Sequence, residues 1–311
     1  MARWMLKAAV QGSIALLPRS QLWNYLLQKH ITRSIDLNEA RLRSKLELYA
    51  RRHIENSFDC RARGTDRLNV LELGTGWYPI LPIAFYLCGA SKIWTIDKQP
   101  LLRPENVKRT VRLFADIARR EDLSAILPHI QKDRIDVLLS LDDDANLMST
   151  PDLLANLNIH ACVQDASRTE LEPGSVDFVF SNGVLNEIPE QILLAILTEF
   201  RRVAPNATMS HYINLMEPFA VFDPSLSSFH FLQYSDTAWK LLNNSLHCHN
   251  RLRISDYRRI HESAGFRILS EQNERGSQEE LDKVHLADKF QRYSRDDLLV
   301  LYSWIVSAPQ N

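Results

Sequence analysis

Cysteine is scarce in this sequence, with four residues among 311. Cys60, Cys88, Cys162 and Cys248 lie far apart, and no two of them form a C-x-x-C pair. This usage is typical of reduced thiols with a structural role, so we expect a cytoplasmic protein. The lack of paired cysteines also argues against an iron–sulfur enzyme.

Long apolar runs are missing as well, since no stretch approaches the roughly 20 apolar residues that cross a bilayer. Lys7 and Gln11 interrupt the apolar start of the chain, and no small-residue cleavage site is obvious, so we expect no signal peptide. No internal repeat or low-complexity tract occurs. The length suits one large α/β domain with additions, or two small domains.

Acidic residues are few at the start of the chain. Residues 1–53 contain ten lysines and arginines but three acids, although the whole chain has a formal net charge of −1. Apolar residues from Leu42 to His53 recur at helical spacing, which predicts a helical appendage over residues 1–60 before a core domain over residues 61–311. Such a segment is either a structural cap or a contact with an anionic membrane surface or an acidic partner. Nucleic acid is not an expected partner, because the glycine-aromatic signature of an RNA module is absent.

The core domain is organised around its first strand and the glycine turn that follows. An apolar strand over residues 69–73 leads into this turn, and Pro79 opens a helix that ends at Gly89. A second apolar strand follows and ends in Asp97. This order predicts a βαβ unit that binds a nucleoside, in which an acid about 20 residues past the turn accepts hydrogen bonds from the ribose.

A nicotinamide dinucleotide is the first alternative ligand, because the G-x-G-x-x-G fingerprint occurs in the same kind of unit. Counted from Gly74, however, the third glycine position holds Pro79. Glu72, inside the strand, also needs a partner or a ligand, since a buried carboxylate is otherwise costly. The dinucleotide is therefore the less favoured interpretation.

Glu72, Gly74 and Gly76 in the order Glu-x-Gly-x-Gly, followed by Asp97, resemble motif I of the class I S-adenosylmethionine-dependent methyltransferases. The resemblance implies S-adenosylmethionine as the cofactor. It further implies that Glu72 lies near the methionine end of this cofactor and that Asp97 binds its ribose, with Thr75 in the same turn.

The resemblance extends to two later segments. Asp165-Ala166 is similar to the segment beside the adenine, where the acid accepts from the amino group and a backbone N–H faces a ring nitrogen. Ser181-Asn182 is similar to the end of the strand beneath the methyl group. No Asn-Pro-Pro-Tyr box occurs, which argues against a methyltransferase of nucleic acid or of protein amide nitrogen.

The remaining apolar segments complete an α/β fold. We expect further strands over residues 159–163, 176–180, 207–215, 266–270 and 298–306. With the intervening helices they predict a doubly wound, seven-stranded, mostly parallel sheet of the Rossmann-like methyltransferase kind, in which the resemblance implies one antiparallel late strand. Helical insertions are expected near residues 121–157 and 216–253, and the second of these is expected to line the acceptor pocket.

Two residues are candidates for catalysis. Glu187 lies near the position at which many small-molecule methyltransferases carry a histidine, and it is a candidate base although this sequence departs from that pattern. His211, in the fifth expected strand, could take a proton from a hydroxyl acceptor, or it could be a histidine packed between strand and helix. No metal is expected, because the three acids of residues 142–144 point in different directions and should form a solvated loop, and residues 247–249 lack further ligands.

The sequence as a whole predicts an S-adenosylmethionine-dependent methyltransferase that acts on a small-molecule or glycan-type acceptor, with oxygen as the expected acceptor atom. One alternative is a non-catalytic cofactor-binding module that docks on a membrane or a partner. A nicotinamide-dependent oxidoreductase is a weaker one. Any membrane contact would be peripheral and would run through residues 1–53.

Overall fold

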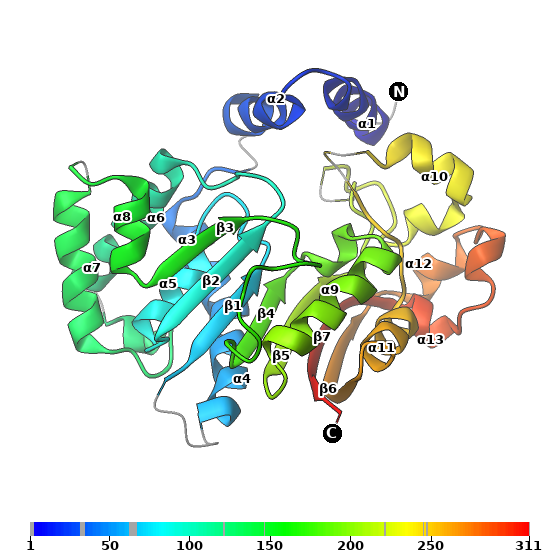
Figure 1. Cartoon of the computed structure of the whole chain (residues 1–311). Coiled ribbons are helices and arrows are strands. Elements are labelled where there is room, and N and C mark those ends of the chain that lie inside the picture. Colours follow the sequence, from blue (N-terminus) through cyan, green and yellow to red (C-terminus); the bar gives the residue numbers. More distant parts are fainter. Residues whose placement is uncertain are drawn as a thin grey trace.

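The chain is built on a seven-stranded sheet in the computed structural model, which describes residues 3–31, 35–61, 67–120, 122–145, 147–220, 222–244, 246 and 248–310 (Figure 1). The strand order is β3-β2-β1-β4-β5-β7-β6, and only β7 runs antiparallel to its neighbours. The strands are β1 (Asn69–Leu73), β2 (Lys92–Asp97), β3 (Ile159–Val163), β4 (Phe178–Asn182), β5 (Thr208–Asn214), β6 (Phe266–Arg275) and β7 (Val300–Pro309). This confirms the predicted fold class, although β4 begins two residues later and β6 and β7 end later than expected.

Helices cover both faces of the sheet, as a parallel sheet requires. Neighbouring residues of β1 point to opposite sides, so that Val70 belongs to one hydrophobic core and Leu71 to the other. The first core is closed by α5 (Ile80–Leu87) and α6 (Pro104–Arg120), and the second by α9 (Glu190–Val203) and α11 (Ile254–Ser263). The first strand is therefore buried on both faces, as its apolar run predicts.

The predicted insertions contain helices. The first holds η3 (Leu123–Ala125), α7 (Lys132–Asp144) and α8 (Thr150–Asn156), and the second holds η5 (His230–Gln233) and α10 (Asp236–Leu242). The expectation of a solvated loop at residues 142–144 was wrong. These acids form the last turn of α7, where Arg119 pairs with Asp142 at 2.7 Å and with Asp143 at 2.8 Å. The remaining short elements are η4 (Leu185–Glu187), α12 (Gln278–Asp282), η6 (Asp288–Phe290) and α13 (Arg295–Leu298).

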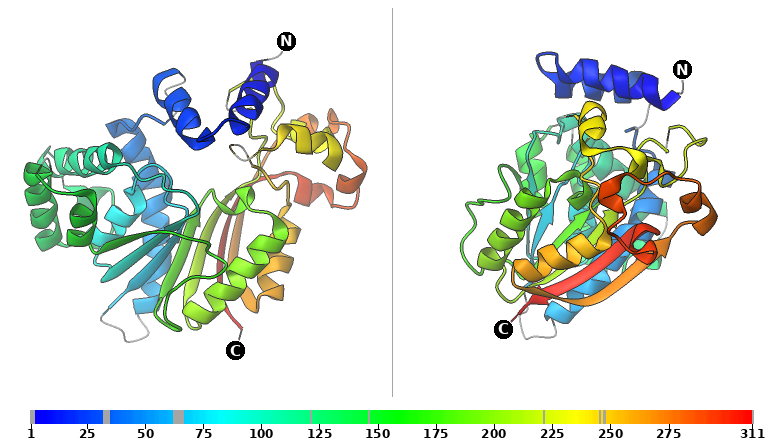
Figure 2. Two further views of the ribbon diagram at one scale, coloured as in Figure 1. Left: turned by 45° about the horizontal axis from the view of Figure 1, so that its top comes forward. Right: turned by 90° about the vertical axis from the view of Figure 1, so that its right-hand side faces the viewer.

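The N-terminal helices form two groups. α3 (Glu39–Lys45), η2 (Leu46–Ala50) and α4 (Arg51–Arg61) pack against the first core through Leu42 and Leu46. α1 (Arg3–Ala15), α2 (Ser20–Leu26) and η1 (Leu27–Ile31) lie above the edge of the sheet at which β1 and β2 end (Figures 1 and 2). We call α1, α2 and η1 the roof. Among the described residues, no helix has the length and hydropathy that a membrane span requires.

Candidate functional site

A cavity of about 1190 Å³ lies between the carboxyl edge of the sheet and the roof. Its walls come from the ends of β1 and β2, from the segments that follow β3 and β4, and from the roof itself. Ligands of doubly wound sheets bind at this edge. Of the residues predicted to act on a ligand, the lining includes Gly74, Asp97, Asp165, Ala166 and Glu187. The fold therefore brings together residues that are up to 113 positions apart in the sequence.

The glycine turn approaches the segment after β4 very closely. Gly74 has a φ of +80°, and a Cβ atom built on it would lie 2.4 Å from Cγ2 of Val184. Gly76 has a φ of +70°, but a Cβ there would have no neighbour within 4 Å. Both positions need the left-handed conformation that glycine adopts freely, and only Gly74 also needs the missing side chain.

These two glycines allow a matched test of the turn. Gly76→Ala should lower the free energy of unfolding by about 1–2 kcal/mol, the cost of a left-handed backbone for a residue with a side chain. Gly74→Ala should cost more than this, because the branched side chain of Val184 is stiff and cannot move aside freely. Adding Val184→Ala to Gly74→Ala should remove the clash with the Val184 side chain but not the cost of the left-handed backbone. The double variant should therefore regain only the steric part of the lost free energy of unfolding. Equal losses in the two single variants, measured by urea unfolding, would contradict this geometry.

Two carboxylate side chains, those of Asp97 and Glu187, line the cavity and interact electrostatically. Oδ2 of Asp97 accepts a hydrogen bond from the backbone N–H of Gly76 at 3.0 Å, and burial raises the pKa of Asp97 above its ordinary value. Glu187 reaches into the cavity from the end of η4, where surrounding protein and then the charge of Asp97 raise its pKa to about 7. A cation bound between them would relieve this repulsion and favour both ionised forms.

Glu72 lies behind the turn, inside the sheet. It is buried, and burial raises its pKa to about 7, although the hydroxyl of Thr95 on β2 donates to its Oε2 at 2.7 Å. The charge of Lys45 also favours the ionised form, whereas the hydroxyl of Thr75, in the turn, has no hydrogen-bond partner among the described residues. Glu72 is not part of the cavity wall. Its described contacts thus tie β1 to β2 beneath the turn.

Asp165 and Ala166 follow β3 and line the cavity next to the end of β2. Asp165 is exposed and accepts hydrogen bonds from the backbone N–H and the hydroxyl of Ser167, at 2.9 and 2.8 Å, which lower its pKa. This is the geometry of a capped loop. Ala166 is buried and contributes apolar surface to the cavity.

Ser181, Asn182 and His211 do not line the cavity. The Ser181 hydroxyl and Nδ1 of His211 are 2.8 Å apart, and both residues are fully buried between β4, β5 and the helices of the second core. Burial, followed by the nearby imidazoles of His261 and His53, lowers the pKa of His211 well below its ordinary value. His211 therefore has the environment of a packed histidine, which was the alternative left open by the sequence.

Three buried histidines predict a loss of stability in acid. Burial lowers the pKa of His53 to about 3 and of His261 to about 4, and it lowers that of His211 as well. In the unfolded chain each imidazole takes up a proton near pH 6.5, so unfolding is favoured as the pH falls below that value. The raised pKa values of Glu72 and Glu187 act in the opposite sense between about pH 4.5 and 7.

The loss should therefore be steepest between about pH 4 and 4.5. His261 is then partly protonated in the folded protein as well, and the glutamates still compensate in part, so about two net protons correspond to about 2.7 kcal/mol per pH unit. Urea unfolding at a series of pH values measures this slope. A free energy of unfolding that stays constant from pH 6 to 4 would contradict the neutral, buried state of these histidines.

The roof supplies wall residues that the sequence did not predict. Lys7 and Val10 come from α1, and burial lowers the pKa of Lys7 to about 7. The Lys7 ammonium lies over the ring of Phe222, in the predicted 216–253 insertion, which also contributes Asn243, Asn244, Leu246 and Cys248 to the wall. Among the described residues, eight carboxamides line the cavity: Gln11, Asn24, Gln28, Gln99, Gln164, Gln191, Asn243 and Asn244. No spacing in the sequence links them, because they come from at least six separate segments.

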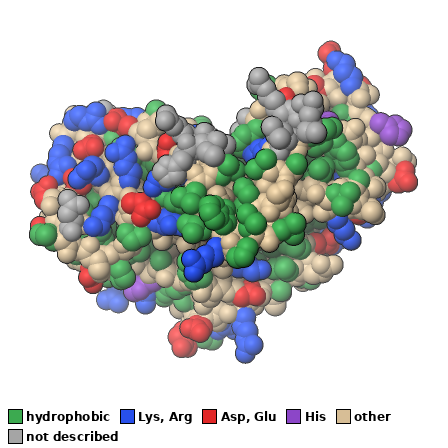
Figure 3. Space-filling view, turned by 90° about the horizontal axis from the view of Figure 1, so that it is seen from above, with side chains coloured by type: hydrophobic (Ala, Val, Ile, Leu, Met, Phe, Trp, Pro, Cys, Tyr) green, Lys and Arg blue, Asp and Glu red, His purple; other side chains and the backbone are tan. Residues whose placement is uncertain are grey.

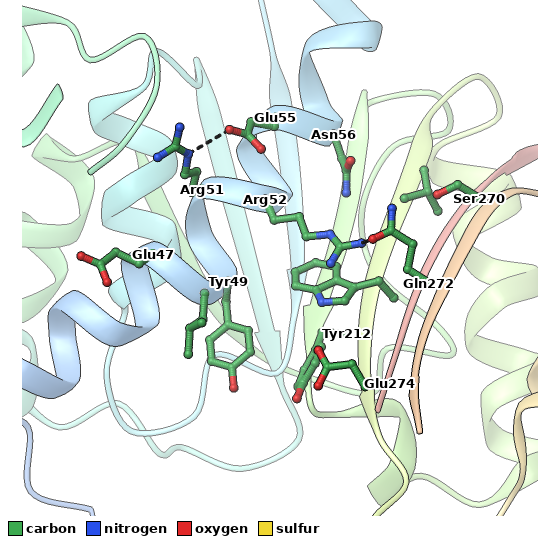
Figure 4. A pocket seen from close by; sticks show the side chains of 13 residues that line it. Glu47, Tyr49, Arg51, Arg52, Glu55, Asn56, Tyr212, Ser270, Gln272 and Glu274 are labelled. Carbon is green, nitrogen blue, oxygen red and sulfur yellow. Dashed lines mark hydrogen bonds and ion pairs between the residues drawn. The ribbon is translucent and has the colours of Figure 1, made fainter. Parts of the chain in front are cut away.

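A second cavity, of about 560 Å³, lies between α4 and the exposed face of β5, β7 and β6 (Figure 4). Tyr49 and Tyr212 approach each other there, with ring centroids 4.9 Å apart, and Arg52 donates to Gln272 at 2.6 Å. None of the predicted site residues lines it. The described residues contain no group of three or more side chains placed to hold a metal ion; His247 of the excluded zinc hypothesis lies outside them.

No model of a protein family matches the chain, and no curated protein does. Among solved structures, the chain is similar to a SAM-dependent methyltransferase from Methanosarcina mazei, with 12% identity, a TM-score of 0.42, and coverage of 80% of this chain and 96% of that one. It is also similar to geranyl diphosphate C-methyltransferase from Streptomyces coelicolor A3(2), with 12% identity, a TM-score of 0.43, and coverage of 82% and 76%. At these values the similarity concerns the fold alone.

Proposed function

We propose that this protein transfers a methyl group from S-adenosylmethionine to a hydroxyl group of a small-molecule or glycan-type acceptor. The observation that carries the proposal is the placement of Asp97 and Glu187 around the glycine turn, inside one cavity at the carboxyl edge of the sheet. Asp97 holds the ribose in this account, and Glu187 takes the proton of the acceptor.

The residues of the cavity fit a cationic nucleoside. Gly76 leaves open space beside Asp97, and the surrounding protein raises the pKa values of Asp97 and Glu187 in a way that a positive charge would offset. When bound, S-adenosylmethionine supplies a methyl group on an activated sulfonium. The protein then needs mainly to hold donor and acceptor in line and to remove one proton.

The carboxamides support a hydroxyl-rich acceptor. A hydroxyl group both donates and accepts, and a carboxamide offers both complements on one side chain. Eight such side chains line the cavity, with Trp77 and Phe222 as apolar surfaces. Glu187, with a pKa of about 7, is ionised in a large fraction of molecules near neutral pH and can accept the proton of such a hydroxyl.

The nicotinamide alternative remains the weaker one. Pro79 occupies the N-cap of α5, where the dinucleotide fingerprint has glycine. A Tyr-x-x-x-Lys spacing, known from some oxidoreductases, does occur at Tyr25 and Lys29, and Nζ of Lys29 donates to the Tyr25 hydroxyl at 2.9 Å. However, Tyr25 is buried, lies outside the cavity wall, and donates in turn to Glu105.

The test of the proposal is transfer of a labelled methyl group. The protein is incubated with methyl-labelled S-adenosylmethionine and a panel of polyols, sugars and glycans, and the products are treated with mild alkali. We expect label that survives this treatment, because a methyl ether is stable where a methyl ester is hydrolysed. Label lost to alkali would instead indicate a carboxylate acceptor. Binding without turnover on any acceptor would favour the non-catalytic module.

A further inference from the structure

The outward side of the roof is apolar, unlike the solvent side of an ordinary surface helix. In α1, Met5, Ala9 and Ser13 recur every four residues, and Leu16 follows on the same side, so none of the positions on this side is charged. The opposite side of the helix packs inward, where Trp4 contacts the ring of Phe219 in the 216–253 insertion. Polar residues would be expected on the outward side if it faced only water.

The exposed side chains are large. Met5 is 47% exposed, Leu16 88%, Leu17 48% and Trp23 50%, all within nineteen residues. We call these four residues the roof patch. Figure 3 looks down on the roof, and hydrophobic side chains gather across the middle of this face. Apolar groups concentrated in this way on one surface mark a contact with a partner or a membrane.

The charge of residues 1–35 indicates the chemical nature of the partner. Residues 1–35 contain five basic residues and no aspartate or glutamate, although Lys7 faces the cavity and Lys29 contacts Tyr25. Arg19 is exposed in the turn between α1 and α2, next to Leu17 and Pro18. A tryptophan and leucines beside basic residues are the composition of helices that lie in the surface of an anionic bilayer.

The basic residues nearer the core are occupied by internal pairs. Arg43 pairs with Glu39 at 3.0 Å, Arg51 with Glu55 at 3.0 Å, and Arg52 lies over the Trp304 ring at 4.3 Å. These residues prompted the sequence-based expectation of a contact through residues 1–53. The structure instead points to the part of that range that precedes α3.

We propose that the roof patch docks on an anionic phospholipid bilayer, with α1 and α2 lying in the plane of the lipid headgroups. Leucine and tryptophan side chains insert into the surface, and Arg19 contacts the anionic headgroups. Because the inner side of the same helices lines the cavity, docking places the cavity next to the membrane surface. This inference is independent of the reaction catalysed in the cavity.

The test is sedimentation of the full chain with vesicles of phosphatidylcholine alone and of phosphatidylcholine with 30% phosphatidylglycerol, a composition chosen for the assay. Leu16→Glu combined with Leu17→Glu should lower the partition coefficient on the anionic vesicles by about tenfold or more, because each leucine loses its apolar burial. Arg19→Gln should lower it less and should weaken its dependence on salt. Leu147→Glu is the matched control, since Leu147 is also 88% exposed but follows α7, which lies apart from α1 and α2 in Figure 1, and binding should be unchanged.

Failure of the wild-type chain to sediment with anionic vesicles would overturn the proposal. So would equal binding to both vesicle types, or an equal loss in the Leu147 control. A dimer in solution that Leu16→Glu and Leu17→Glu convert to a monomer, without any vesicle binding, would assign the roof patch to self-association instead. Melting temperatures of all variants are compared with wild type, and the exposed positions make unchanged values the expected result.

Discussion

Glu187→Gln is expected to lower the rate of methyl transfer by about 10²- to 10⁴-fold at saturating cofactor, the usual effect of removing a general base. The substitution keeps the size of the side chain but removes the group that takes the acceptor proton. Since the pKa of Glu187 is about 7, the wild-type rate should also rise as the pH increases through neutrality. A cation held next to this carboxylate would move the midpoint of that rise to a lower pH. The variant should lose this pH dependence.

His211→Gln is the control for this experiment, because His211 is the competing candidate. It is fully buried and outside the cavity wall, so its replacement should lower stability through the lost Ser181 contact and leave the rate within a few-fold of wild type. A slow His211 variant beside an unaffected Glu187 variant would reverse the assignment. Unchanged rates in both would indicate an acceptor that is already ionised, such as a carboxylate, which needs no base.

Asp97→Asn is expected to weaken binding of S-adenosylhomocysteine by about 10- to 150-fold. The ribose hydroxyls lose a charged acceptor, and a hydrogen bond to a charged group contributes about 1.5–3 kcal/mol. Asparagine can still accept the Gly76 N–H through its side-chain oxygen, so the turn should keep its shape. The affinity is measured by isothermal calorimetry.

Asp165→Asn should have a smaller effect in the same titration. Asp165 is exposed, and its carboxylate already has two hydrogen bonds from Ser167. The order of the two effects matters more than their sizes. If Asp165→Asn weakens binding more than Asp97→Asn does, the nucleoside lies differently in the cavity from the arrangement inferred from the β1–β2 unit.

Local sequence signals were sufficient for the sheet and for one wall of the cavity. Within 29 residues the sequence shows an apolar strand, a turn with two glycines, and Asp97 at the end of the next strand. This order is typical of a βαβ unit that binds a nucleoside, so few other local folds fit it. The carboxyl edge of a parallel sheet then places Glu187 near Asp97, because β4 is adjacent to β1.

The sequence did not reveal which side chains of the strands point into the cavity. A period of two places neighbouring residues of β5 on opposite faces, but both faces are covered, so the pattern does not reveal which residue reaches the cavity. The resemblance pointed to Ser181, and the position of His211 in the fifth strand made it a candidate base with a packed histidine as the alternative. The two side chains instead face each other in the interior. Glu187, in the irregular segment after β4, has no such constraint.

The roof could not be predicted because its contacts are long-range. Lys7 meets Phe222 across more than 200 residues of sequence, and a single amphipathic helix does not show what its two sides will contact. Only the three-dimensional arrangement shows that the inner side of α1 faces a cavity. The apolar outward side was visible in the sequence as Met5, Leu16 and Leu17, yet an apolar side normally indicates a buried one.

The most direct test of the account is calorimetric titration of the purified chain with S-adenosylhomocysteine and, separately, with NAD. The account predicts saturable one-site binding of the sulfur nucleoside, and at a hundred times its dissociation constant a stabilisation of about 2.7 kcal/mol. At the same ligand concentration Asp97→Asn should lower that stabilisation to about 0.3–1.4 kcal/mol, and NAD should give no binding heat. Saturable binding of NAD, with no heat from S-adenosylhomocysteine or S-adenosylmethionine, would contradict the account.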